Sequence, residues 1–282
     1  MILDKRNTVP FPVAKLNIPP FPQVALKVLK LTQSDDVQLA QLEKLILTDA
    51  AFASEVLKIA NSYLYASRYP VKDLKQACAT LGMQALNGVC LTVGVRTYLG
   101  KTLNDPAMRS LWQHNLATAL IGEQMAKGGI INAGVAYTAG ILHDVGRIGL
   151  GVIYPKEYGQ LLFSHKGDPS TMLDREVADF GVDHCEIGES IVSEWELPSL
   201  YLEAVSDHHS ARNSDGRWTI GELVKIACRL ADTTGFPAFP GCETTAYDDL
   251  ICLMPGRERR NLPVTCDELR FAVTARMSEI EG

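Results

Sequence analysis

Several features that mark common protein classes are missing from this sequence of 282 residues. There is no long run of lysines and arginines, and 27 basic residues against 33 acidic ones give a net charge of −6. Because nucleic-acid backbones attract clustered positive charge, this balance argues against binding to nucleic acid. No histidine occurs in residues 1–113 or 210–282. The six histidines therefore share one region, which suggests two parts of the chain with different roles.

Disulfide and zinc-ribbon patterns are also missing. The seven cysteines are odd in number, and no two of them form a Cys-X-X-Cys motif. Buried, reduced thiols are therefore expected. The N-terminus lacks the apolar core of a signal peptide. The longest uncharged stretch, residues 76–95, is interrupted by polar side chains, whereas a bilayer span needs about 20 predominantly apolar residues. We expect buried helices there, and a cytoplasmic protein without membrane contact.

Apolar residues recur with the period of an α-helix through most of the chain, and the alternation typical of β-strands is nearly absent. The predicted fold class is all-α. In the second half the expected helices span 106–127, 132–146, 171–180, 184–195, 198–209 and 218–233. A last helix opens with the capping-box spacing of Thr265 and Glu268. One short apolar run, residues 148–154, is compatible with a strand or a loop.

Histidines and aspartates form a regular series in the second half. Its members are His114, His143-Asp144, His184, His208-His209 and Asp232. Successive gaps of 29, 41, 24 and 24 residues each match about one helix–loop–helix unit. Each side chain can thus come from a different helix and converge in the interior of one bundle. Imidazole-rich ligation favours Fe, Mn, Zn or Ni over Mg.

Each member of the series also has an ordinary structural interpretation. His114 lies on an apolar helical stripe, where a lone histidine is more often a hydrogen-bonded core residue than a ligand. A His-Asp dipeptide arises often by chance, and a solvated helix end explains His208-His209 equally well. Asp232 falls at a helix C-terminus, where either a nearby cation or solvent would remove the unfavourable interaction with the helix dipole. His165, in a polar segment, is expected at the surface. The joint pattern carries more weight than any single residue.

The order of these residues resembles the HD superfamily of metal-dependent phosphohydrolases, and most of all its HD-GYP cyclic-di-GMP phosphodiesterases. The Gly-Tyr-Pro signature of that branch is missing after His208-His209. Ser110 stands where some such enzymes carry glutamate, and Arg147 where the HD-GYP pattern has lysine. Other segments resemble the HDOD domain, the HD-related output domain of bacterial signalling proteins. These segments are residues 18–25, 48–62, 77–83, 142–147, 181–188 and 195–198.

The HDOD resemblance covers residues 13–235. It implies a helical N-terminal subdomain, residues 13–105, packed on an HD-like metal-site bundle, residues 106–235. A C-terminal extension with a final helix, residues 236–282, follows. The resemblance also implies a role in bacterial signal transduction. No receiver or kinase pattern occurs in the chain. Partners are therefore expected in trans, among two-component or cyclic-di-GMP-related signalling proteins.

Carried over position by position, the resemblance implies one or two divalent transition metals. His114, His143, Asp144 and Asp232 would hold one metal, and His184, His208 and His209 a second metal bridged by Asp144. Two such metals bind phosphoryl oxygens and lower the pKa of a bridging water, which would attack phosphorus.

Asp144 and Arg147 are the catalytic candidates. The planar guanidinium of Arg147 suits a phosphoryl group, although a structural ion pair would explain this residue equally well. The chain is expected to be a metal-dependent phosphohydrolase or phosphodiesterase acting on a nucleotide-like substrate. The alternative is a non-catalytic signalling module with a structural or vestigial metal site.

Overall fold

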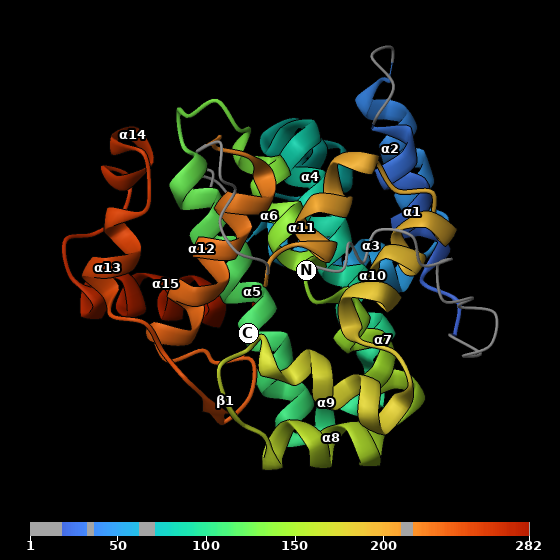
Figure 1. Cartoon of the computed structure of the whole chain (residues 1–282). Helices are drawn as coiled ribbons and strands as arrows, with labels where there is room; N and C mark the ends of the chain where they lie inside the picture. Colours follow the sequence, from blue (N-terminus) through green and yellow to red (C-terminus); the bar gives the residue numbers. More distant parts are fainter. Residues whose placement is uncertain (1–18, 33–36, 62–70, 210–216, 282) are drawn as a thin grey trace.

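The computed structural model describes residues 19–32, 37–61, 71–209 and 217–281, and these are mostly helical (Figure 1). The all-α prediction is confirmed. Within the described residues the strands are β1 (Lys166–Gly167) and β2 (Gly241–Cys242), which pair in parallel. The start predicted for the HDOD domain, residue 13, lies outside the described residues, as do residues 210–216 after the paired histidines.

The N-terminal helices gather around one long helix. Helices α1 (Gln23–Leu31), α2 (Leu39–Ile46) and α3 (Ala50–Ala60) all pack against α4 (Leu74–Leu99). A left-handed φ of 70° at Gly82 kinks α4. The segment Leu74–Asn104 is long and apolar enough to cross a bilayer, but 56% of its apolar window is buried inside the fold. Such burial is typical of a core helix.

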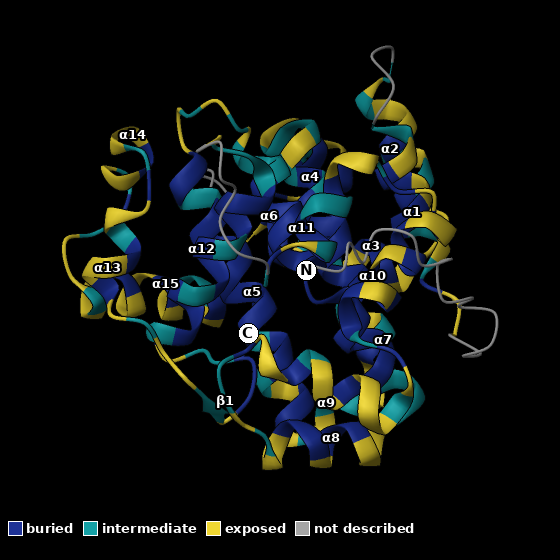
Figure 2. Cartoon of the chain, viewed as in Figure 1, coloured by how far each residue is buried: buried dark blue, intermediate teal, exposed yellow. Residues whose placement is uncertain are grey.

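The second half builds a bundle around α5 (Pro106–Ala126). Helices α6 (Ala133–Leu142) and α12 (Ile220–Thr233) pack against α5, and α4 packs against α6. Figure 2 shows α5 and α12 mostly in the colour of buried residues. The other helices of this half are α7 (Val145–Ile153), α8 (Pro155–Ser164), α9 (Thr171–Phe180), α10 (His184–Glu194) and α11 (Leu202–Ser206).

Two expected elements differ in the structure. The helix expected at 132–146 ends at Leu142, and α7 begins at Val145, so the run 148–154 is helical almost to its end. Asp144, with φ −101° and ψ 24°, departs from helical geometry and separates the two helices. The segment 198–209 forms a short 3-10 turn, Ser199–Tyr201, followed by the five residues of α11. The helical periodicity of apolar residues in the sequence does not reveal such short interruptions.

The C-terminal segment packs on the bundle. Helices α13 (Tyr247–Cys252), α14 (Gly256–Arg259) and α15 (Cys266–Glu281) contact α12 or α5. The predicted capping box forms: Thr265 N donates to Glu268 Oε2 at 3.1 Å, and Glu268 N donates to Thr265 Oγ1 at 3.3 Å. One core cluster contains residues from all three predicted parts of the chain.

Candidate metal centre

Asp144 lies at the centre of the predicted site. The turn between α6 and α7 places its carboxylate in the interior, where the residue is 1% exposed. Its Oδ1 atom lies 3.5 Å from His184 Nε2 and 3.2 Å from His208 Nε2. Its Oδ2 atom lies 3.6 Å from His143 Nε2 and 3.9 Å from His114 Nε2. The carboxylate therefore faces two separate sets of imidazoles, one with each oxygen.

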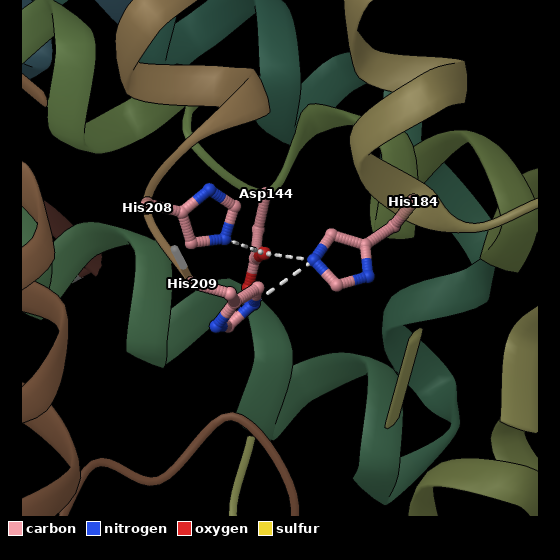
Figure 3. A group of neighbouring side chains, drawn as sticks. All are labelled: Asp144, His184, His208 and His209. Atoms are coloured by element: carbon pink, nitrogen blue, oxygen red, sulfur yellow. Dashed lines mark hydrogen bonds and ion pairs between the residues drawn. The ribbon is translucent and has the colours of Figure 1, made fainter. Parts of the chain in front are cut away.

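The first set, called the histidine group, comprises Asp144, His184, His208 and His209 (Figure 3). One ligand-type atom from each of these residues lies within 4.8 Å of the others. His184 begins α10, and the paired histidines follow α11. His209 Nε2 lies 3.0 Å from His184 Nε2. The fold thus brings together four predicted site residues that are separated by up to 65 positions in the sequence.

The second set, called the cysteine group, comprises His114, His143 and Cys228. His114 Nε2 lies 3.3 Å from His143 Nε2 and 3.4 Å from Cys228 Sγ. Cys228 was not among the predicted site residues. The predicted ligand Asp232 lies one turn further along α12, and its Oδ1 atom is 3.4 Å from His114 Nδ1. It therefore lies behind the His114 ring, and its role as a ligand stays a prediction.

Each of four histidines has a hydrogen-bond acceptor at Nδ1, while its Nε2 atom faces Asp144. The pairs are His114 with Phe236 O (2.8 Å), His143 with Gly140 O (2.7 Å), His208 with Val205 O (3.1 Å) and His184 with Glu176 Oε2 (2.5 Å). Each acceptor favours the tautomer with its proton on Nδ1, which leaves an Nε2 lone pair directed at the centre. Lone pairs so close together repel each other unless a cation lies between them. The arrangement therefore fits a bound metal.

Glu176 contacts the candidate site but was not among the residues predicted from the sequence. It lies on α9 and is fully buried, unlike the exposed acidic residues Asp174 and Asp179 of the same helix. Its Oε1 atom accepts a hydrogen bond from Tyr158 at 2.7 Å, and its Oε2 atom accepts one from the backbone N–H of His184 at 2.9 Å. In the sequence, only the position of Glu176 one turn after Met172 indicates that its side chain is buried, and this indication is weak.

The charges at the centre suit metal binding. Burial would raise the pKa of Asp144, but Arg147 and His143 hold that pKa well below its usual range. Burial lowers the pKa of His143, His208 and His209, against the opposing effect of the Asp144 carboxylate. The carboxylate is therefore ionised and these imidazoles are neutral, which are the forms that bind metals.

Arg147 is fully buried beside Asp144. Its Nε donates to Asp144 Oδ1 at 3.0 Å, and its Nη2 lies 3.4 Å from His209 Nε2. The guanidinium carbon is 5.9 Å from the centre of the Phe239 ring. Its Nη1 has no hydrogen-bond partner among the described residues. Arg147 can thus neutralise Asp144 and still offer one donor to an anion.

A cavity of about 340 Å³ adjoins the histidine group, with His208 and His209 in its wall. Helix α12 contributes Lys225 and Arg229, which pair with Glu222 at 3.0 Å and Asp168 at 2.8 Å. Apolar lining comes from Ile226 on α12 and from Leu250 and Leu253 in the C-terminal segment. The cavity thus combines cations with apolar surface next to the ligand-type side chains.

The comparison with protein families decides the identity of the chain. Residues 18–211 match the HDOD domain family. The chain belongs to this family. A protein of uncharacterised function from Treponema pallidum (strain Nichols) is 27% identical to this HDOD chain over 198 residues. Those residues are 69% of the chain but 38% of the relative, so the chain spans well under half of that protein's length.

Solved structures show the same HDOD fold. A Geobacter sulfurreducens HDOD domain protein of unknown function is 26% identical, with a TM-score of 0.71 over 94% of this chain and 91% of that one. A Shewanella amazonensis SB2B protein, provisionally named a metal-dependent phosphohydrolase, is 20% identical, with a TM-score of 0.65 over 95% and 96%. A Marinobacter aquaeolei VT8 protein, provisionally named a signal transduction protein, is 19% identical, with a TM-score of 0.68 over 97% and 62%. At these identities the last two support the fold alone.

Proposed function

We propose that this HDOD protein holds one or two divalent transition metals, from among Fe, Mn, Zn and Ni, and hydrolyses a phosphate ester. One observation carries the proposal. The buried Asp144 directs one oxygen to the histidine group and the other to the cysteine group, and four imidazoles face it with Nε2. Imidazoles and carboxylates together are the donors that such metals prefer. Among the described residues, His208 Nε2 has no hydrogen-bond partner, whereas the Nε2 atoms of His114 and His184 face Cys228 Sγ and His209 Nε2.

The residues of the site would have the following roles. Asp144, His184, His208 and His209 would hold one metal, and His114, His143 and the second oxygen of Asp144 another. A bound metal would supply Lewis-acid polarisation of a phosphoryl oxygen. Glu176 keeps the His184 proton on Nδ1. Arg147 stabilises the ionised form of Asp144 and has Nη1 available for a phosphoryl oxygen. Asp144 and Arg147 remain the catalytic candidates.

The cavity beside the histidine group supports a nucleotide-like substrate. A phosphate would compete with Glu222 and Asp168 for Lys225 and Arg229. The apolar side chains of Ile226, Leu250 and Leu253 suit a flat base. A volume of about 340 Å³ lies at the lower end of the range for small-molecule sites, about 300–1,000 Å³. We therefore propose a ligand the size of a mononucleotide rather than a larger cyclic dinucleotide.

The biological setting is part of the same proposal. We infer a cytoplasmic role in bacterial signal transduction, with signalling partners of the two-component or cyclic-di-GMP-related systems acting in trans. Membership of the HDOD family supports this role. The seven cysteines are all free thiols, as in a reducing compartment. The net charge of −6 supports the absence of nucleic-acid partners, and the burial of α4 supports the absence of membrane contact.

Metal analysis and hydrolysis assays test this function. Protein purified without chelator should contain metal, and it should release phosphate or a nucleoside from a panel of nucleotides in the presence of Mn or Fe. Asp144→Asn should abolish both metal binding and hydrolysis, because the carboxylate shared by the two groups loses its charge. Asp174→Asn, at an exposed carboxylate, is the matched control and should leave both unchanged. Stoichiometric metal without hydrolysis of any nucleotide would contradict the catalytic proposal.

One observation favours a second candidate, a non-catalytic signalling module. Arg147 already pairs with Asp144 at 3.0 Å, so the chain supplies one positive charge to the centre itself. If the centre is only structural, Asp144→Asn should preserve the signalling output as long as the protein folds. Loss of output in a folded Asp144→Asn protein would exclude this second function.

A further inference from the structure

Cys228 brings a thiol into direct reach of two imidazoles. Cys228 is buried on α12. This helix packs against α5, which carries His114. We propose that the Cys228 thiolate, together with His114 and His143, is a direct ligand of a divalent metal. The inference rests on the metal-binding part of the proposed function and does not depend on hydrolysis.

Two distances within the cysteine group, both from His114 Nε2, match the edges of a coordination tetrahedron. Zinc binds nitrogen at about 2.0–2.1 Å and sulfur at about 2.3 Å, so tetrahedral ligands are separated by about 3.4 Å (N to N) and about 3.6 Å (N to S). His114 Nε2 lies 3.3 Å from His143 Nε2 and 3.4 Å from Cys228 Sγ. The three ligand-type atoms all lie within 4.8 Å of one another, so one ion can reach all three of them.

The site also offers a fourth ligand for the metal and negatively charged donors. Asp144 Oδ2 lies 3.6 Å from His143 Nε2 and 3.9 Å from His114 Nε2, so it can complete the tetrahedron or leave that position to a ligand. When the sulfur–metal bond forms, the thiol gives its proton to the solvent. The thiolate and the Asp144 carboxylate then supply two negative charges against the two positive charges of the ion, and the imidazoles stay neutral. The Arg147 guanidinium beside Asp144 leaves one positive charge in excess.

Asp232, the ligand that the sequence predicts, acts through His114 in this arrangement. Its Oδ1 atom accepts a hydrogen bond from the backbone N–H of Ala238 at 3.1 Å and faces Nδ1 of His114. The metal-facing atom of the ring is Nε2. Asp232 therefore lies on the Nδ1 side of His114, where Phe236 O is the hydrogen-bond acceptor at 2.8 Å, and it is a positioning residue that acts on the ring through its charge. The soft donor comes from Cys228. A thiolate ligand favours Zn, Fe or Co over Mn and Mg at this position.

Cobalt substitution tests the thiolate ligand directly. The metal-free full chain is titrated with Co(II), and the near-ultraviolet sulfur-to-cobalt charge-transfer band is recorded together with the visible d–d bands. Wild-type protein should develop the charge-transfer band, and Cys228→Ser should lose it. Cys90→Ser, at a buried thiol of α4, is the matched control and should keep it. Asp232→Asn should also keep the band while weakening cobalt binding about 10–100-fold.

A second measurement needs no variant. X-ray absorption on zinc-loaded wild-type protein should reveal a sulfur neighbour of the metal. This measurement tests the assignment even if Cys228→Ser does not fold. Cobalt binding without a charge-transfer band, a band that survives in folded Cys228→Ser, or zinc with only nitrogen and oxygen neighbours would each overturn the assignment. So would wild-type protein that binds no metal. A sulfur neighbour in a protein without hydrolytic activity would leave this inference intact and refute only the catalytic function.

Discussion

At the level of single residues, the geometry of the candidate metal centre depends on groups that lie behind the histidine rings. Glu176, Gly140, Val205 and Phe236 each accept at Nδ1 of one histidine and so aim its Nε2 atom at Asp144. Glu176 is the only carboxylate side chain among these four acceptors, and the pKa of this buried carboxyl is held low against burial by His184. An acceptor of this kind also increases the basicity of the ligand.

Glu176→Gln should therefore weaken the histidine group without removing a ligand. The glutamine is nearly isosteric but neutral, so His184 loses its charged acceptor, and metal affinity should fall about 10–100-fold. Competition with a chelating dye measures the change. Asp174→Asn on the same helix provides the control, since that carboxylate is exposed. Equal affinities of wild type and Glu176→Gln would show that the His184–Glu176 contact has no influence on the metal.

At the scale of secondary-structure elements, the close contact between α7 and α10 places His184 opposite Asp144. A methyl group added at Gly146 would overlap the backbone carbonyl of His184, so glycine is required for the two helices to approach. The periodicity of the sequence predicts α10 correctly, but it misses the turn that separates α6 from α7 at His143-Asp144. That turn is needed because Asp144 must face both groups.

Gly146→Ala should destabilise the protein by about 1–3 kcal/mol, because α7 and α10 must move apart to admit the methyl group. Urea denaturation measures the loss. Gly256→Ala on α14 is the matched control, since nothing lies within 4 Å of a methyl group there. A Gly146→Ala protein as stable as wild type would mean that the two helices separate at no cost.

At the scale of the whole molecule, residues 236–281 belong to the same core and reach the candidate metal centre. Phe236 supplies the backbone acceptor for His114, Phe239 lies beside Arg147, and Leu250 lines the cavity. On α15 the buried side chains are Leu269, Val273, Met277 and Ile280, and Trp112 Nε1 of α5 donates to Glu281 Oε1 at 3.0 Å. The segment is therefore expected to fold together with the bundle.

Met277→Ala should lower the free energy of unfolding by about 2–5 kcal/mol, the cost of removing a buried methionine side chain. The transition should remain single, since α15 shares one core with the bundle. Phe271→Ala on the same helix is the control. That ring is 78% exposed, so its loss should change stability by no more than about 0.5 kcal/mol. Separate unfolding of α15 in either protein would contradict a shared core.

The buried imidazoles also make the stability of the metal-free protein depend on pH. The pKa values of His143, His208 and His209 are lowered by burial, whereas histidines in the unfolded chain titrate near about 6.5. At a pH between the pKa of these histidines in the folded state and their pKa in the unfolded state, the unfolded chain binds more protons. The free energy of unfolding is therefore highest above about pH 6.5 and decreases as the pH falls towards the pKa of the folded state.

Denaturation in the presence of a chelator should therefore show a decrease in the free energy of unfolding below about pH 6.5, of up to about 1.4 kcal/mol per pH unit for each proton taken up. His143→Gln should reduce this slope, because one of the titrating groups is gone. A stability that does not change from pH 7 to pH 5 would refute the assignment of neutral imidazoles.

The all-α class, most helix positions and the series of histidines and aspartates around Asp144 can be read from the sequence, because they follow from local periodicity and from spacing along the chain. The positions of Cys228 beside His114, of Glu176 behind His184 and of Asp232 behind His114 depend on how the helices pack. Cys228 and His114 are 114 positions apart, and no local pattern distinguishes a buried thiol that faces an imidazole from one that faces leucines. The packing of α12 against α5 settles that difference.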